Sequence, residues 1–95
     1  MQYAYAIDFI APSASQRQFS DWMDAEPFTA MDAAHDWFCI DGKAEDEDGS
    51  PFDGEYACTV YAREDEDAVP HVVDACTFRG HVCDYSTPDW VERIR

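Results

Sequence analysis

The chain has 95 residues with 21 acidic and 6 basic side chains, which gives a formal net charge of −15 at pH 7. A charge this large exceeds what solubility needs and opposes direct binding to nucleic acid, because phosphate contacts require lysine and arginine. The length and the aromatic share of 15% are typical of one folded domain covering residues 1–95, and they exclude a disordered acidic tail.

The first part of the chain is predicted to form a strand and then a helix. Apolar and polar side chains alternate in residues 2–10, which is the pattern of a strand with one buried face. Ser13 and Ser15 are each followed three residues later by a glutamine, which is the spacing of a helix capping box. The apolar residues that follow have helical spacing, so we expect a helix that ends near Glu26, before Pro27.

A hairpin is predicted in the middle of the chain. Residues 28–34 fit a turn of helix that begins at Thr29, and residues 35–41 have the composition of a second strand. Residues 42–54 are acidic and rich in glycine, which indicates a loop, and residues 55–63 alternate as a third strand does. We expect the second and third strands to pair through this loop.

The last part of the chain is expected to hold a helix, a strand and a short helix. Residues 64–67 are all acidic and would complement the dipole at the start of a helix over 68–77. Residues 81–85 are predicted to form a fourth strand, and residues 89–95 a terminal helix. The resulting order, β-α-β-β-α-β plus a short C-terminal helix, predicts an α+β, ferredoxin-like fold, in which helices cover one face of an antiparallel sheet.

The sequence carries no signal for a membrane or for export. It contains no run of 18 apolar residues, so we expect no membrane span, and its N-terminus lacks the basic region of a signal peptide. We therefore expect a cytoplasmic protein with reduced thiols, although one or two disulfides are an open alternative. The flanks of Cys39, Cys58, Cys76 and Cys83 are largely apolar, and we interpret these cysteines as small buried side chains.

No motif of a hydrolase, a phosphate-binding loop or a zinc protease occurs, so we expect no enzymatic activity and no cofactor. A metal site would have to be assembled in the tertiary structure from His35, Cys39, His81 and Cys83, and we expect core thiols and half-exposed histidines instead. The acidic loop does not match a calcium-binding helix-loop-helix motif, because Ala44 stands at the first ligand position.

Two runs of carboxylates are the candidate partner-binding elements. A rigid acidic surface can imitate a phosphate backbone, because neighbouring side chains on strands and helices lie about 5–7 Å apart. Aromatic side chains beside the charge would supply apolar anchors at an interface. The predicted partner-binding residues are Glu45, Asp46, Glu47, Asp48, Asp53, Glu64, Asp65, Glu66 and Asp67, with Phe52, Tyr61 and Trp90 as anchors.

In size, in charge and in the runs Glu45-Asp46-Glu47-Asp48 and Glu64-Asp65-Glu66-Asp67, the chain resembles phage-encoded anti-defence proteins, namely DNA-mimic anti-CRISPR and anti-restriction proteins. The resemblance covers composition and includes no alignable motif, so no residue roles are carried over. It implies a non-catalytic inhibitor that occupies the basic nucleic-acid-binding site of a CRISPR effector complex or a restriction enzyme. It also implies action in the cytoplasm of the host cell.

Two other functions fit the same composition. Asp outnumbers Glu and Arg outnumbers Lys, as in salt-adapted proteins, so a salt-adapted ferredoxin-like housekeeping domain that forms a homodimer through its sheet is one alternative. A small metal or thiol protein is the other. A function directed at a partner predicts carboxylates gathered on one surface, whereas salt adaptation predicts carboxylates spread over the whole surface.

Overall fold

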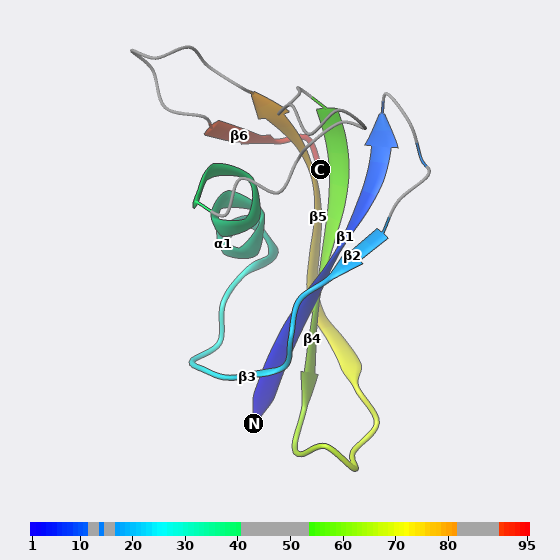
Figure 1. Cartoon of the computed structure of the whole chain (residues 1–95), viewed down its shortest axis with the longest axis vertical. Helices are drawn as coiled ribbons and strands as arrows, with labels where there is room; N and C mark the ends of the chain where they lie inside the picture. The colour runs from blue at the N-terminus through cyan, green and yellow to red at the C-terminus, as the bar shows by residue number, and fades with distance from the viewer. Residues whose placement is uncertain (12–13, 15–16, 41–53, 82–89) are drawn as a thin grey trace.

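The computed structural model describes residues 1–11, 14, 17–40, 54–81 and 90–95, which form one antiparallel sheet with a helix packed on one of its faces (Figure 1). The strands are β1 (Gln2–Ala11), β2 (Arg17–Phe19), β3 (Met23–Asp24), β4 (Gly54–Arg63), β5 (His71–His81) and β6 (Trp90–Arg93). The helix is α1 (Ala30–His35), which continues as a π-helical segment over Asp36–Ile40. The strand order is β2-β1-β4-β5-β6, and β3 also pairs with β1.

The α+β class is confirmed, whereas the ferredoxin-like order of elements is not. The described elements follow one another as three strands, a helix and three strands. The strand predicted over 2–10 is present as β1, the strand over 55–63 as β4, and the helical turn from Thr29 as α1. Because β1 and β4 are long strands with unpaired edges, the segments next to them in the chain add to the sheet as further strands.

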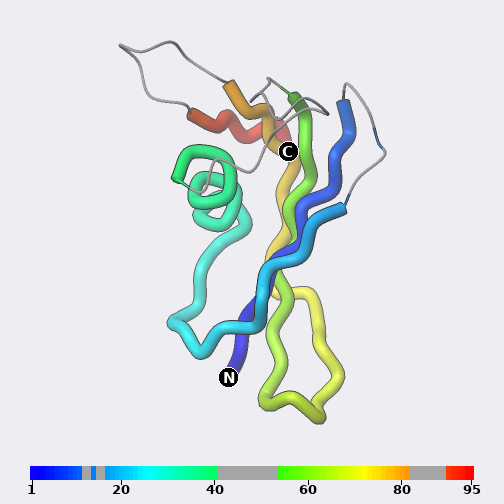
Figure 2. Tube along the Cα trace, in the orientation of Figure 1, coloured from blue at the N-terminus to red at the C-terminus, as the bar shows by residue number. Residues whose placement is uncertain are grey.

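The helix predicted to end near Glu26 is wrong. The chain here runs along the edge of β1 as β2 and β3 before it turns toward α1, as Figure 2 shows. The helical spacing of Phe19, Trp22 and Met23 does not give them a common buried face. Phe19 and Trp22 line the same hollow on one side of the sheet, whereas Met23 lies beside residues of α1 on the other side. Pairing with β1 satisfies the backbone groups of this segment that a helix would have paired internally.

The helix predicted over 68–77 is also wrong, because this segment contributes to β5. Strand β5 pairs with β4 in antiparallel register, with Cys58 opposite Cys76, and a bulge lies at Val60 and Tyr61. The β-branched valines of this segment fit a pleated surface at least as well as a helix. The sequence of this segment is compatible with a helix and with a strand, and pairing with the edge of β4 makes it a strand.

Two further predictions fail near the ends of the described segments. Residues 35–40 are not a strand, because His35 ends α1 and the π-helical segment Asp36–Ile40 follows it and buries Trp37 and Phe38, whereas Asp41 lies outside the described part of the chain. The terminal helix predicted over 89–95 is also wrong for the described residues 90–95, because Trp90–Arg93 form β6, which pairs with the end of β5.

Two predicted elements cannot be placed. The strand predicted over 81–85 coincides with the structure only at His81, the last residue of β5, and its remaining residues lie outside the described part of the chain. Most of the predicted acidic loop over 42–54 also lies outside it, since the description resumes at Gly54.

Aromatic rings build the core between α1 and the sheet, in a chain that has no leucine. Trp37 meets Phe9 and Tyr56 edge-on with ring centroids 5.7 and 5.0 Å apart, and Tyr56 stacks on Phe78 at 5.3 Å. Edge-on and offset pairs of this kind are the favoured geometries of aromatic rings. The buried residues of α1 are all small, which lets the helix backbone lie close to these rings: Ala30, Ala33 and Ala34.

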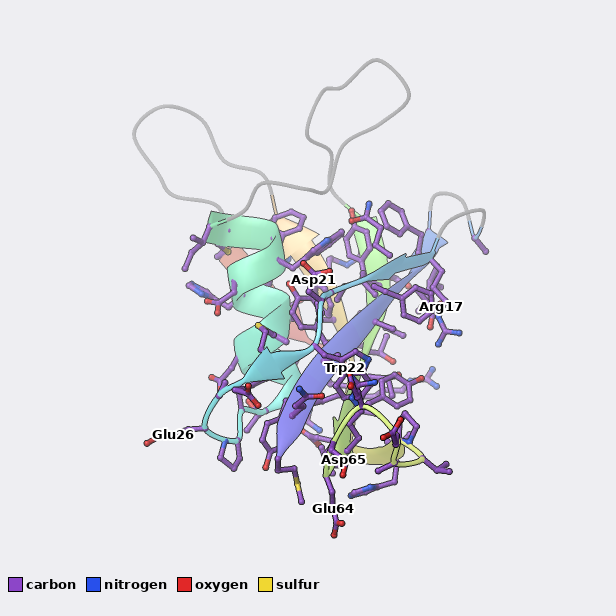
Figure 3. The ribbon with its side chains drawn as sticks, turned by 60° about the horizontal axis from the view of Figure 1, so that its bottom comes forward. Arg17, Asp21, Trp22, Glu26, Glu64 and Asp65 are labelled. Atoms are coloured by element: carbon purple, nitrogen blue, oxygen red, sulfur yellow. The ribbon has the colours of Figure 1, made fainter. Side chains whose placement is uncertain are left out.

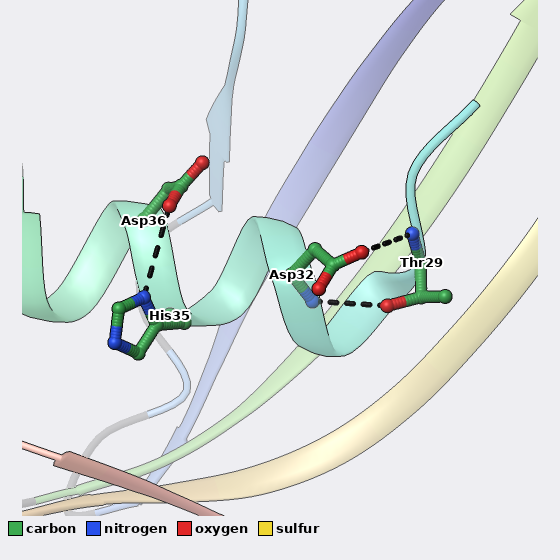
Figure 4. A network of polar contacts seen from close by, with 4 residues as sticks. All are labelled: Thr29, Asp32, His35 and Asp36. Atoms are coloured by element: carbon green, nitrogen blue, oxygen red, sulfur yellow. Dashed lines mark hydrogen bonds and ion pairs between the residues drawn. The ribbon is translucent and has the colours of Figure 1, made fainter. Parts of the chain in front are cut away.

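A reciprocal capping box starts α1 (Figure 4). The Asp32 N–H donates to Thr29 Oγ1 and the Thr29 N–H donates to Asp32 Oδ2, both at 3.1 Å. The Ala30 N–H donates to Asp74 Oδ2 on β5 at 2.8 Å, which ties the start of the helix to the sheet. These bonds satisfy N–H groups that have no partner within the helix.

Replacing Thr29 by alanine is expected to lower the free energy of unfolding by about 1 kcal/mol, because the substitution removes the acceptor of the Asp32 N–H. Urea unfolding followed by circular dichroism measures the change. Thr29→Ser is the matched control, since serine keeps the hydroxyl acceptor and should retain most of the stability. Equal losses in the two variants would show that the methyl group, and not the cap, is responsible.

The two faces of the sheet differ. We call the face that α1 covers the helix face, to which Tyr56, Cys58 and Val60 belong, and the opposite face, with Thr59 and Tyr61, the open face. In the described segments no helix covers the open face (Figure 1). Within the same segments, no helix has the length and apolar character needed to cross a membrane.

Candidate functional site

Several predicted partner-binding residues lie outside the described part of the chain. These are the acidic run Glu45–Asp48, the anchor Phe52 and the neighbouring Asp53. Their role remains a prediction from the sequence. The structure places the second acidic run, Tyr61 and Trp90.

The run Glu64–Asp67 forms the turn between β4 and β5, whereas the sequence predicts it at the start of a helix. The Asp67 N–H donates to Asp65 Oδ1 at 2.9 Å, and the Ala68 N–H donates to the Asp65 carbonyl at 3.2 Å. Asp65 thus closes the turn with its own side chain, as aspartate often does. All four acidic side chains of the turn are exposed. The hairpin therefore presents a run of carboxylates at one end of the sheet.

Further carboxylates lie at the same end. The register places Asp24 of β3 opposite Gln2, and Gln2 opposite Arg63, which immediately precedes the turn. Glu26 follows β3 in the chain, and in Figure 3 it lies in the lower half of the view, as Glu64 and Asp65 do, but its side chain points to the left, away from them. We call this surface the acidic end, and its exposed members are Asp24, Glu26, Glu64, Asp65, Glu66 and Asp67.

Sequence reasoning missed Asp24 and Glu26 as members of this surface. The predicted helix ending near Glu26 would have placed them at a helix C-terminus, away from the second acidic run. Only the pairing of β3 with the first residues of β1 brings Asp24 near the turn between β4 and β5 and Glu26 to the same end of the molecule. No spacing in the sequence indicates this pairing.

The two described anchors, Tyr61 and Trp90, lie at opposite ends of the sheet. Tyr61 stands opposite Val72 near the start of β5, whereas Trp90 stands opposite His81 at its end. Trp90 stacks on the His81 ring with centroids 4.0 Å apart. The structure therefore places Tyr61 near the acidic end and separates Trp90 from it by the length of β5, which is about 30 Å at the usual strand rise.

A hollow in the open face adjoins the acidic end. It has a volume of about 360 Å³ and lies between β1, β4 and the segment that links β2 to β3. Its apolar walls are aromatic rings and a proline. We call it the aromatic hollow, and it is lined chiefly by Ala4, Phe19, Ser20, Trp22, Tyr61 and Pro70. Phe19 and Trp22 are functional candidates that the sequence reasoning assigned to a helix core.

Two arginines already lie on rings of this hollow. The Arg17 guanidinium lies 5.0 Å from the Phe19 ring centroid and forms an ion pair with Asp8 at 2.9 Å. The Arg63 guanidinium lies 4.2 Å from the Trp22 ring centroid. Both distances are in the range of cation–π contacts. The cations are therefore engaged with the walls of the hollow and hold the rings in place.

Arg17 and Arg63 are also held by polar groups of the open face. An Arg17 N–H donates to the Tyr61 hydroxyl at 3.4 Å, and the Arg63 Nε–H donates to Gln2 Oε1 at 2.7 Å. Tyr61 thus connects the central strand β4 to β2 across β1. These contacts shield Ala4, which is buried although it belongs to the open face.

Burial makes the thiols of the sheet poor nucleophiles. Cys58 is fully buried, and this desolvation, reinforced by Cys76 and Asp74 nearby, raises the pKa of its thiol to about 12. Desolvation also raises the pKa of Cys76, whose thiol lies 3.5 Å from the sulfur of Met31. The thiolate is the reactive form, so these two cysteines are inert at neutral pH. They are buried, as the sequence predicts, whereas Cys39 is only partly so.

The metal site considered from the sequence can be tested only in part. Cys83 lies outside the described segments, and within them no group of three or more His, Cys, Asp and Glu side chains is placed to hold a metal ion. His35 and His81 approach different carboxylates, with His35 Nδ1 3.7 Å from Asp36 and His81 Nε2 3.7 Å from Glu92.

The candidate site is thus the acidic end together with the aromatic hollow. A cluster of exposed carboxylates attracts cationic partners over a distance, and an apolar hollow retains a side chain that reaches it. Neither part needs a cofactor to act in this way. Comparison of the chain with protein-family models, with curated proteins and with solved structures finds no significant match, so the functional argument depends on this geometry.

Proposed function

We propose that this protein is a non-catalytic inhibitor that binds the basic nucleic-acid-binding surface of a protein partner through its acidic end. The observation that carries the proposal is that exposed carboxylates from β3, its following loop and the β4–β5 turn lie at one end of the molecule. The partner would lose its nucleic acid because the acidic end occupies the same cationic cleft. Given its expected cytoplasmic location, the partner would be a cytoplasmic protein.

The pairing of the carboxylates supports a partner-directed surface. On the open face, Asp8 is paired with Arg17 and Glu55 with Arg79, so these two carboxylates are neutralised within the molecule. Among the described residues, the members of the acidic end form no ion pair. Such carboxylates repel one another and oppose folding, and a cationic partner would relieve this repulsion.

The spacing of the carboxylates also suits imitation of a nucleic acid. Duplex DNA carries about one negative charge per 1.7 Å of its axis, shared between two strands. Neighbouring strands of a sheet are about 4.8 Å apart, and alternate residues along a strand about 6.7 Å apart. Because β1 separates β3 from β4, the carboxylate of β3 lies about 10 Å, or two strand spacings, from the hairpin turn, and the consecutive residues of the turn supply the closest spacing.

The proposal is tested by displacement of labelled duplex DNA from purified nucleic-acid-binding proteins. The resemblance in size and charge makes CRISPR effector complexes and restriction enzymes the first proteins to examine. We expect competitive displacement that weakens between 0.1 and 1 M salt, because the Debye length falls from about 10 Å to about 3 Å. Glu64→Lys combined with Glu66→Lys should lower the association rate constant at least about tenfold.

A matched pair of substitutions separates position from net charge. Asp36→Lys with Glu92→Lys changes the net charge by the same amount at two exposed residues that do not belong to the acidic end. We expect this control pair to retain most of the displacement. Equal loss in the two pairs would reject the acidic end as the binding surface. Lack of displacement from every protein, together with unfolding at low salt and recovery in molar KCl, would favour salt adaptation.

The first acidic run is tested separately. Reversal of Glu45–Asp48 to lysine is expected to abolish capture of the partner that the displacement assay identifies. This run precedes β4 in the chain, and the acidic turn follows β4, so the two runs are separate acidic segments that are tested by separate substitutions. Binding of the variant to that partner is measured by surface plasmon resonance. Unchanged binding would remove this run from the interface and leave the acidic end as the contact.

A further inference from the structure

The aromatic hollow is placed to complete an interface that the acidic end begins. It opens on the face of the sheet beside Trp22, and Asp21 precedes this tryptophan in the chain (Figure 3). Pro70, on its opposite wall, follows the acidic turn by a few residues. A partner segment attracted by the carboxylates therefore lies within reach of the hollow.

The flanks of the hollow are acidic on balance. Arg17 is neutralised by Asp8, with which it forms an ion pair at 2.9 Å. The second cation, Arg63, stands between Asp24 and Glu64, because the register places Gln2 between Arg63 and Asp24 and because Glu64 follows in the chain. Cationic residues on either side of an inserted side chain would meet favourable charge.

We propose that the aromatic hollow receives one aromatic side chain from a basic segment of the partner protein. This inference rests on the proposed function, and it assigns the apolar contact of the interface to Phe19, Trp22 and Tyr61. The acidic end would then accelerate association, and the hollow would slow dissociation. This division follows from the long range of charge interactions and the short range of apolar contact.

The chemistry of the walls favours an aromatic occupant over a cationic one. The Arg17 and Arg63 guanidinium groups already lie over the Phe19 and Trp22 rings, so a third cation would be repelled there. The volume of about 360 Å³ is adequate for one phenylalanine or tryptophan side chain. Rings in contact at centroid distances of about 4.5–7 Å stabilise one another beyond the area that they bury, and buried aromatic anchors dominate interface energies.

The test uses three synthetic peptides that share the same lysine-rich flanks and differ at one central residue, which is phenylalanine, alanine or arginine. Isothermal titration calorimetry measures their affinities for the full-length protein, and NMR of the labelled protein reports on the Trp22 indole N–H. We expect the phenylalanine peptide to bind about tenfold more tightly than either of the others and to shift the Trp22 signal. The alanine peptide should bind weakly, through charge alone.

Variants of the protein assign this difference to the hollow. Trp22→Ala should abolish the preference for phenylalanine and leave the affinity for the alanine peptide unchanged. Trp90→Ala is the matched control, because this tryptophan is exposed on β6 and lies away from the hollow, and it should keep the preference. Ala4→Val provides a second test that keeps all three rings, since its methyl groups would reduce the space above β1.

The outcomes distinguish this inference from the proposed function. Equal, salt-sensitive binding of the three peptides would reject the aromatic occupant while the acidic end retains its role. Tighter binding of the arginine peptide would assign the hollow to a cation and reject the inference. A dimer of the free protein that Trp22→Ala dissociates would assign the hollow to a second copy. If no peptide binds, either to the unsubstituted protein or to the variant with Glu64→Lys and Glu66→Lys, both proposals are rejected.

Discussion

Replacing Trp37 by alanine is expected to lower the free energy of unfolding by about 3–5 kcal/mol, the range found for loss of a buried aromatic side chain. Trp37 is 1% exposed and contacts rings from β1, β4 and β5. Its indole N–H also donates to Gln18 Oε1 on β2 at 3.0 Å. One side chain of the helical segment thus contacts four strands, and its removal would leave a cavity at the centre of the core.

Two controls separate the parts of this effect. Trp37→Phe keeps an aromatic ring but loses the bond to Gln18, so we expect a smaller loss of about 1–3 kcal/mol. Trp90→Ala removes a tryptophan that is 44% exposed and should change stability by less than about 1 kcal/mol. Urea unfolding at neutral pH measures all three. Similar losses for Trp37→Ala and Trp90→Ala would contradict the central role of Trp37.

Stability is expected to fall steeply at alkaline pH because of Cys58. Burial raises the pKa of its thiol from 9.0 to about 12 in the folded protein, so the folded state keeps the proton that the unfolded chain releases near pH 9. The contribution is fully present below pH 9 and is lost as the pH rises toward 12. Between these values one such thiol lowers the free energy of unfolding by about 1.4 kcal/mol per pH unit. Cys76, whose thiol pKa is also raised, adds to the loss in the same direction.

The measurement is the pH dependence of urea unfolding in the presence of a reductant. Cys58→Ala should reduce the slope above pH 9, whatever its effect on stability at neutral pH. Cys39→Ala is the matched control for removal of a thiol, since Cys39 is only partly buried, and this variant should keep more of the slope than Cys58→Ala does. A slope that Cys58→Ala leaves unchanged would refute this origin of the alkaline sensitivity.

The strands β1 and β4 and the start of α1 were predictable from the sequence because their signals are local. In β1 large side chains alternate with small or polar ones from Gln2 to Phe9, β4 alternates over its ten residues, and Thr29 has its capping partner Asp32 three residues away. The exposure of Glu64–Asp67 was also predictable, because burying four successive carboxylates in a core would cost too much free energy. These features depend on residues close together in the chain.

The remaining strands were not predictable in this way. The segments of β2, β5 and β6 contain apolar residues at helical spacing, and they become strands because β1, β4 and β5 present edges that need partners. The course of β5 past α1 also depends on Gly80, where a side chain would overlap the Phe38 ring. Nothing in the sequence near Gly80 indicates that Phe38 packs there.

The candidate site also has parts that the sequence predicts and parts that only the tertiary structure shows. Composition alone determined that this is a small, strongly acidic domain, and the run Glu64–Asp67 marked one part of its charged surface. Only the tertiary structure decided that Asp24 and Glu26 join that run and that Phe19 and Trp22 form a hollow with Tyr61. The physical reason is that sheet pairing brings together residues from distant segments. Side-chain spacing within one segment carries no information about its partner in the sheet.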